Sequence, residues 1–340
     1  MAGKITDRQI GVFDTRALVG AFDPKISEFK FSEPRFGANQ QAMYLYGGMH
    51  SESGKFYVVE RKFLASMTGG LFIMSNQGGS MELDPGSPRS GRGEVRREFS
   101  DTSMRWHEPI MQRIPEELRV AEEQPLDLTV TDDEFRWSEG NLLELSGPSP
   151  SVGLQFVAPM KGMSLVYQSQ CYWLKGTLLG EEAEGPIFYD NIFWTPHGLE
   201  WKETPMYTDR QVSWTIFGNK LDDGATQFGH LISMTGGMAI AAIAEDQEPL
   251  VLSDRVDLSF ELDEDSYVTR ATHDVEGQRW TFTEDTDGHM EGHSKARWGE
   301  YRAQSGQVRR EGETREVTKG FTWVECFADR IRAEGLTKQI

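Results

Sequence analysis

Apolar and polar residues alternate along much of the chain with the two-residue period of β-strands. Residues 126–131 (LDLTVT), 256–262 (VDLSFEL) and 280–283 (WTFT) all follow this pattern. Such alternation indicates strands with one buried face and one face in water. Clusters of Asn, Asp, Ser and Gly that favour tight turns stand between the strands, at residues 52–54, 138–141, 222–224 and 285–288. The pattern predicts an all-β protein built of antiparallel sandwiches or barrels.

Helical periodicity is scarce in this sequence. We predict only a few short helices, at residues 5–22, around residues 115–121, and from Ala328 towards the C-terminus. Residues 180–185 are acidic and are bounded by glycines, so we expect a linker between strands there. This linker is the predicted domain boundary, with one domain over residues 1–180 and a second over residues 181–340.

Length and composition describe an ordinary globular protein. The chain has 340 residues, enough for two domains that each bury a core. Hydrophobic residues make up 38% and aromatic residues 11%, which suits strands and apolar cavities. The formal net charge of −19 would repel nucleic acid and anionic membranes, so neither is an expected partner. Solubility is the preferred explanation of this acidity.

The cysteine content and the apolar segments of the sequence indicate in which cellular compartment the protein is expected. Cys171 and Cys326 are the only cysteines, so neither a disulfide framework nor a CxxC metal or redox motif is present. Residues 1–13 lack the apolar core of a secretion signal, and the longest apolar stretch, residues 234–244, is too short to span a bilayer. We therefore expect a cytoplasmic protein without a membrane span. Its oligomeric state is left open, with a homodimer as one option.

Familiar cofactor and metal motifs are missing from the sequence. It contains no phosphate-binding loop, no GxGxxG after a strand, no HExxH and no GxSxG. His289 and His293 have a spacing that would align them on a helix, but the glycines around them favour a hairpin. We prefer a solvated turn to a metal site here, and we predict no metal.

One carboxylate stands out because of its apolar surroundings. Residues 167–179, 185–194 and 212–217 are predicted strands rich in aromatic residues, and Asp190 and Asn191 lie inside the second of them. Burial of a carboxylate is costly and raises its pKa, which is the condition for a general acid near neutral pH. Alternatively, Asp190 anchors a turn or binds nearby backbone amides. The residues alone do not decide between these alternatives.

Around Asp190 the chain resembles the double-calycin superfamily that includes the AttH-like proteins and the carotenoid 1,2-hydratases. The family pattern is a strand ending in Gly, a spacer, Gly-x-x-Trp-x-Asp-His-Glu-Trp-Gly, and later an aromatic strand that ends in Leu-x-Asp-Gly. Gly176 and Gly185 stand at the glycine positions, and residues 189–193 stand where the acidic and histidine core belongs. Residues 214–217 and 221–224 match the aromatic strand and its turn.

The resemblance covers most of the chain but departs from the family at two positions. Asp190 retains the family aspartate, whereas Asn191 and Ile192 replace the His and Glu, which puts chemistry that needs those two groups in doubt. Looser matches are found at residues 32–63 and at residues 320–327, which resemble the opening and closing strands of bacterial relatives.

The resemblance implies two lipocalin-like barrels packed together, with a site in or between them and no organic cofactor. Family members add water to isoprenoid double bonds, and the related fungal Diels–Alderases steer pericyclic ring closure. We therefore expect a cofactor-independent lyase, hydratase or isomerase that acts by acid–base chemistry on a bulky aromatic or isoprenoid molecule. The rival is a carrier that binds an apolar ligand without chemistry. A structural protein, the third option, would have no internal cavity.

Asp190 is the candidate acid or base, and Asn191 would hold the substrate or the carboxylate. His50 is a candidate partner at the end of a strand, unless it is an exposed hairpin histidine. Glu325, in an aromatic strand, is either on the wet face or a second buried carboxylate in the cavity. The candidates to line the pocket are Tyr189, Tyr172, Trp173, Trp214 and His230. Tyr172 and Trp173 are neighbours on a strand, so only one of them can face the pocket.

Overall fold

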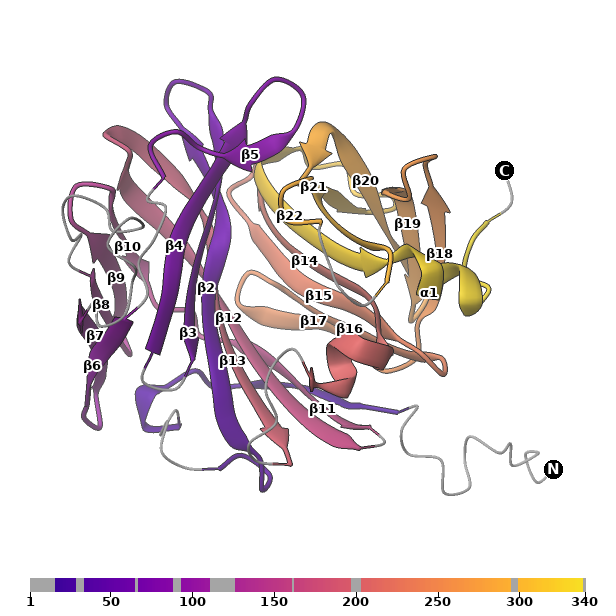
Figure 1. Ribbon diagram of the computed structural model, residues 1–340, viewed down its shortest axis with the longest axis horizontal. Helices are drawn as coiled ribbons and strands as arrows, with labels where there is room; N and C mark the ends of the chain where they lie inside the picture. The colour runs from indigo at the N-terminus through magenta and orange to yellow at the C-terminus, as the bar shows by residue number, and fades with distance from the viewer. Residues whose placement is uncertain are drawn as a thin grey trace.

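The described residues fold mainly into antiparallel strands that form two sheets packed together (Figure 1). The structure, a computed structural model, describes residues 16–28, 34–64, 67–87, 93–110, 126–160, 162–196, 203–294 and 299–338. Helices are short: the 3-10 helix Ile26–Glu28, the π-helical turn Met206–Arg210, and α1 (Ala328–Ala333). The predicted all-β class is confirmed, and so is the predicted helix from Ala328.

The first sheet closes into a barrel of ten strands. Closure depends on the long strand β12, which pairs with β10 near its end and with β13 along its length. β11 and β1 extend the sheet from the beginning of β12, and β5 pairs with β4. The strands are β1 (Leu18–Phe22), β2 (Asn39–Ser51), β3 (Phe56–Leu64), β4 (Met67–Asn76), β5 (Met81–Leu83), β6 (Gly93–Phe99), β7 (Ser103–Ile110), β8 (Leu126–Thr131), β9 (Glu134–Glu139), β10 (Leu143–Pro148), β11 (Gly153–Met160), β12 (Met163–Leu178) and β13 (Glu181–Thr195).

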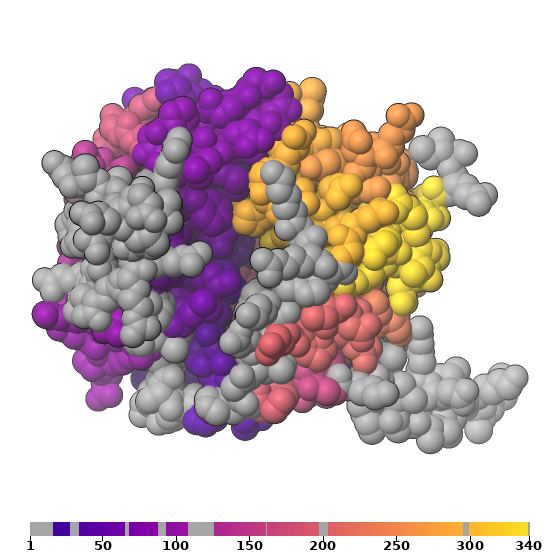
Figure 2. Space-filling view, in the orientation of Figure 1, coloured from indigo at the N-terminus to yellow at the C-terminus, as the bar shows by residue number. Residues whose placement is uncertain are grey.

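The second sheet has nine strands in the order β17-β16-β15-β14-β22-β21-β20-β19-β18 and forms an open half-barrel. The prediction of two packed barrel-like halves is therefore confirmed, and the halves appear as adjoining lobes in Figure 2. Its strands are β14 (Gln211–Leu221), β15 (Thr226–Met234), β16 (Met238–Glu245), β17 (Glu248–Ser253), β18 (Asp257–Leu262), β19 (Val268–Val275), β20 (Gln278–His289), β21 (Tyr301–Arg310) and β22 (Val317–Phe327).

Both faces of the barrel wall are buried near the second sheet. One set of alternate side chains fills the barrel interior, including Leu45, Val59, Phe135 and Tyr189. The other set points outward, where β2 and β13 pack against β22. Strands buried on both faces lose the simple alternation of apolar and polar residues. This explains why the sequence around Asp190 is a nearly continuous apolar run.

Three local predictions are wrong. Residues 18–22, placed in a helix, form β1, because pairing with β11 outweighs weak local propensity. Residues 180–185 are no linker, since Leu179 and Gly180 adopt positive φ in a tight turn and β13 begins at Glu181. Residues 285–288 lie within β20 as a bulge rather than a hairpin turn. The helices predicted over residues 5–15 and 115–121 fall outside the described residues.

The domain boundary at residues 180–181 stays a prediction about folding units. In terms of sheet membership, the chain passes from the first sheet to the second between β13 and β14. Within the described ranges, none of the helices has the length and apolar character that crossing a membrane requires.

Glycines allow β2 and β13 to approach each other closely. A Cβ atom on Gly185 would lie 1.9 Å from the carbonyl oxygen of Gly48, and one on Gly47 would lie 2.0 Å from that of Pro186. Only glycine fits such contacts.

A candidate active site between the two sheets

A cavity of about 320 Å³ lies between the outer face of the barrel and the second sheet. Strands β2, β3, β12 and β13 form one wall, strands β14, β21 and β22 form the other, and the π-helical turn closes one side. Because side chains alternate along a strand, every second residue of the barrel wall faces this cavity. The lining residues are Tyr44, Tyr46, Glu60, Lys62, Met163, Leu165, Tyr167, Asp190, Ile192, Met206, Tyr207, Gln211, Trp214, Ile216, His293, Tyr301, Trp323, Glu325 and Phe327.

Asp190 is the buried carboxylate of this cavity, with 2% of its surface exposed. The hydroxyl of Tyr46 donates a hydrogen bond of 2.6 Å to Oδ2, and the hydroxyl of Tyr167 donates to the same oxygen. Burial raises the pKa of Asp190 to about 6, although the hydroxyls of Ser169, Tyr167 and Tyr46 act to lower it. Among the described residues, no Lys, Arg or His side chain pairs with it. Asp190 can therefore gain or lose a proton near neutral pH.

The two tyrosines that hold Asp190 remain protonated. Burial raises the pKa of both Tyr46 and Tyr167 well above 10, and the nearby Asp190 carboxylate adds to the effect. They therefore serve as neutral hydrogen-bond donors rather than as charged partners. Five of the nine tyrosines of the chain line the cavity, which combines apolar ring surface with hydroxyl groups.

A second polar group lies at the less buried part of the cavity. Glu60 and Lys62 are two residues apart on β3 and share a face, while Glu325 reaches the cavity from β22. Burial raises the pKa of Glu60, Lys62 lowers it, and Glu325 raises it further. Burial also lowers the pKa of Lys62, whose Nζ lies 4.8 Å from the ring centre of Tyr44. Besides Asp190, the cavity thus holds a second set of acid–base side chains, which consists of Glu60, Lys62 and Glu325.

The structure brings three of the sequence-predicted site residues together. Asp190 from the barrel, and Glu325 and Trp214 from the second sheet, all line the cavity. The two carboxylates come from opposite walls. The sequence left open whether Glu325 lies on the wet face or in the cavity, and the structure places it at the cavity.

Three other predicted residues point into the barrel instead of the cavity. Tyr189 and Tyr172 belong to the apolar barrel core, and the hydroxyl of Tyr172 donates 2.6 Å to Gln170. Asn191 accepts a hydrogen bond of 2.9 Å from the side-chain amide of Gln40. Tyr189 and Asn191 flank Asp190 on β13, so alternation alone sends them to the opposite face.

Trp173, His50 and His230 lie on the cavity side of the barrel or near it but do not line the cavity. Trp173 lies under Lys220, with Nζ 5.5 Å from the ring centre. The ring of His50 contacts the carbonyl of Gly320 at 2.7 Å. His50 lies six residues along β2 from the residue that pairs with Asp190, so about 20 Å of strand separates His50 from Asp190. The ring of His230 lies 5.4 Å from that of Tyr167, and burial lowers its pKa to about 3. His230 is therefore a neutral group behind the Asp190 cluster.

Sequence reasoning missed most of the polar lining. Tyr44, Tyr46, Glu60 and Lys62 occupy alternate positions on β2 and β3, so alternation was a signal that each pair shares a face. It could not show that the second sheet covers this face. His293, expected in a solvated turn, is instead half-buried at the cavity with its ring 5.2 Å from that of Trp323.

Several solved structures are similar to this chain. A protein described as a candidate AttH from Nitrosomonas europaea matches with a TM-score of 0.43 and 12% identity, over 84% of this chain and 90% of that one. Kievitone hydratase from Nectria haematococca matches with a TM-score of 0.38 and 12% identity, over 88% and 92%. No family model and no curated protein matches the chain. The resemblance to AttH-like proteins that the sequence indicates recurs in the first of these matches. Likenesses of this degree carry no function to this chain.

Proposed function

We propose that this protein is a cofactor-independent enzyme of the lyase or isomerase type, hydratases included, that acts on a bulky apolar small molecule. The observation that carries the proposal is the Asp190 cluster. A carboxylate that is buried without a cationic partner, and that two tyrosines hold at the wall of a cavity, is costly for stability and suited to proton transfer. Its pKa of about 6 matches the requirement for a general acid or base near neutral pH.

The cavity supports a substrate with a large apolar surface and few polar groups. Its volume of about 320 Å³ is that of a small-molecule site, and Trp214, Trp323 and Phe327 give it aromatic walls. Aromatic and isoprenoid molecules both fit this description. A flat ring could stack between the two sheets, with the tyrosine hydroxyls available to its polar substituents.

Proton transfer in this cavity would involve the two carboxylates on opposite walls. In a hydration, one acid delivers a proton to one carbon of a double bond, and one base removes a proton from the water that adds to the other carbon. Elimination is the reverse, and an isomerisation moves a proton from one carbon to another. Asp190 is the proposed acid or base for one of these transfers, and Glu325 is the proposed second group.

The test begins with native mass spectrometry of purified protein to identify a bound apolar ligand, followed by turnover assays on that molecule and its hydrated or isomeric forms. We expect Asp190→Asn to lower kcat by about 10²-fold to 10⁴-fold and to leave ligand affinity within a few-fold of wild type. Asp274→Asn is the matched control, because Asp274 pairs with Arg279 at the surface, away from the cavity.

A carrier is the second candidate function, favoured by Asn191 and Ile192 at the positions of the family His and Glu. Asn191 also points into the barrel, away from the cavity. If the protein is a carrier, wild type and Asp190→Asn should bind the ligand with equal affinity and release it unchanged. Ligand recovered without any conversion by wild type would overturn the enzymatic proposal.

A further inference from the structure

A second cluster of chemically active side chains lies outside the cavity, at the bulge of β20. Among the described residues, Asp263, Glu284 and His289 form the one group in which three potential metal-binding atoms lie within 4.8 Å of one another. The Nε2 atom of His289 is 3.3 Å from a carboxylate oxygen of Glu284 and 3.9 Å from one of Asp263. The bulge shifts the pairing between Glu284 and His289 and so brings these two residues to one place.

Neighbouring groups orient the members of this cluster. The imidazole ring of His289 stacks on Tyr267, with centroids 3.7 Å apart and planes 6° from parallel. Oδ1 of Asp263 accepts the backbone N–H of Tyr267 at 2.7 Å, while Oδ2 is the oxygen nearest His289. A hydrogen bond that orients a ligating carboxylate, like the one to Asp263, is typical of metal sites. All three side chains are between 27% and 29% exposed, so an ion can reach them.

The spacing and the donor types identify the class of ion. In tetrahedral zinc sites the bonds to nitrogen and oxygen are about 2.0–2.2 Å, which places neighbouring donors about 3.3 Å apart. The two carboxylate oxygens lie 3.3 and 3.9 Å from Nε2 of His289, and all three donor atoms lie within 4.8 Å of one another, so side-chain rotation would have to draw them together to reach that geometry. One imidazole with two carboxylates suits a first-row divalent ion, whereas calcium prefers six or more oxygen ligands.

We propose that Asp263, Glu284 and His289 bind a divalent cation of the Zn²⁺ type, with water completing the coordination. The ion would connect the turn between β18 and β19 to the end of β20. His289 lies four residues before His293, which lines the cavity, so the ion would also hold the start of the segment that carries His293. This site does not depend on the proposed enzymatic function.

The competing explanation is an ion pair between protonated His289 and the two carboxylates. Arg302 lies over the ring of Tyr267 at 5.4 Å and lowers the pKa of Tyr267, whereas the nearby Glu291 carboxylate raises it. An ion pair requires a protonated imidazole, whereas metal binding requires a neutral imidazole and therefore becomes stronger as pH rises. The pH dependence of binding therefore separates the two explanations.

The experiment is isothermal titration of the full-length, tag-free protein with Zn²⁺ at pH 6 and pH 7.5, after treatment with a chelator. We expect one site, tighter at pH 7.5, and visible absorption of tetrahedral Co²⁺ in place of Zn²⁺. His289→Ala should weaken Zn²⁺ binding by more than about tenfold, the loss typical when a group that only supports a metal ligand is removed. Glu284→Gln is the second variant, with circular dichroism to confirm that each protein is folded.

His107→Ala is the matched control. His107 lies 3.2 Å from Glu98, so it forms a histidine–carboxylate pair with no third ligand among the described residues. Its loss should leave the Zn²⁺ affinity unchanged. Binding that is absent in wild type, or equal in wild type and His289→Ala, would show an ion pair only and would overturn the proposal.

Discussion

Two buried carboxylates, one in the barrel interior and one between the sheets, have opposite kinds of partner. Inside the barrel, Oε1 of Glu139 lies 3.3 Å from Nε of Arg61 and accepts a hydrogen bond of 2.9 Å from the indole of Trp137. Between the sheets, Asp190 has two neutral tyrosines. Burial raises the pKa of both carboxylates, but only Glu139 has a cation that lowers it again. A carboxylate in a filled core is compensated, whereas one at a cavity without a counter-charge is poised for proton transfer.

The two regions also differ in how they are filled. A closed barrel lets side chains from every strand meet at its centre, and apolar residues fill that space. The outer face of the barrel and the second sheet are separate surfaces, and they leave a cavity where they meet. We therefore expect substitutions in the barrel interior mainly to lower the free energy of unfolding. Substitutions between the sheets should mainly affect proton transfer at the cavity.

The largest expected effect is the loss of the counter-charge in the barrel. Arg61→Met leaves Glu139 buried without a cation, which should lower the free energy of unfolding by about 3–5 kcal/mol. Urea unfolding followed by tryptophan fluorescence measures this change. In the double variant Arg61→Met/Glu139→Leu most of the stability should return, because no charge is left buried. A loss below about 1 kcal/mol in the single variant would mean that water already reaches Glu139.

The next effect concerns the pH dependence of stability that Asp190 causes. Its pKa is raised from 3.8 to about 6 by folding, so the folded state holds this proton more tightly than the unfolded state. The resulting stabilisation is complete below pH 4 and is lost as pH rises through about 6, a change of about 3 kcal/mol. Unfolding of wild type and Asp190→Asn at pH values from 4 to 8 isolates this contribution. Wild type should lose stability relative to the variant as pH rises, and parallel profiles would contradict the assignment.

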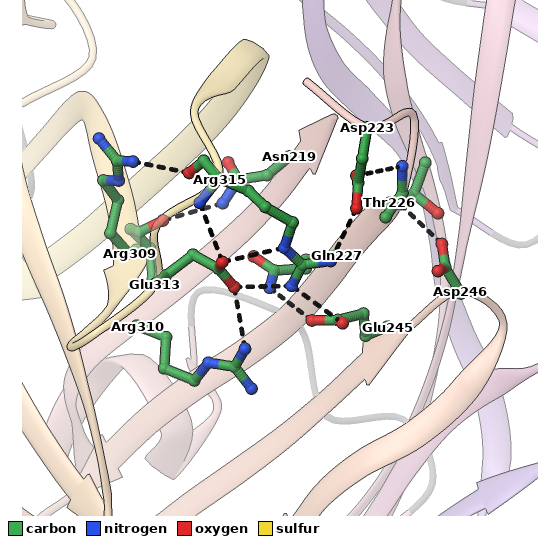
Figure 3. A network of polar contacts seen from close by, with 12 residues as sticks. Asn219, Asp223, Thr226, Gln227, Glu245, Asp246, Arg309, Arg310, Glu313 and Arg315 are labelled. Carbon is green, nitrogen blue, oxygen red and sulfur yellow. Dashed lines mark hydrogen bonds and ion pairs between the residues drawn. The ribbon is translucent and has the colours of Figure 1, made fainter. Parts of the chain in front are cut away.

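The smallest effect is expected at the ion-pair network that joins three turns of the second sheet (Figure 3). Arg315, between β21 and β22, pairs with Glu313 at 2.6 Å, with Glu245 at 3.0 Å and with Asp223 at 3.4 Å. These groups lie near water, which screens their attraction. Arg315→Gln should lower the free energy of unfolding by about 1 kcal/mol, and less at high salt.

Arg136→Gln is the control for this third effect, because Arg136 forms a single exposed pair with Glu134. Its change should be smaller than that of Arg315→Gln. A loss at Arg315 as large as that at Arg61 would mean that partial exposure does not weaken these charges, and would undermine the comparison between buried and exposed pairs.

Much of the fold could be predicted because strand patterns are local. The strands that contain residues 126–131, 212–217 and 320–327 were predictable from their own residues. The bulge in β20 was not, since its Asp and Gly residues equally suit a turn and only pairing with β21 keeps them in the strand. β1 was mistaken for helix because its strand partner, β11, lies more than 130 residues further along the chain.

For the candidate site, the sequence alone determined that Asp190 lies in an apolar aromatic strand, where burial raises its pKa. Alternation also determined that Tyr189 and Asn191 oppose it. Only the tertiary structure decided which of these two faces lines the cavity, because both faces of β13 are buried and the apolar pattern does not distinguish them. It also decided that Tyr46 and Tyr167 contact Asp190 and that Glu325 lines the same cavity, since these three residues come from three other strands. The apolar setting of a residue can be inferred from its neighbours in the sequence, whereas the partners of a buried charge depend on which strands the folded sheets bring together.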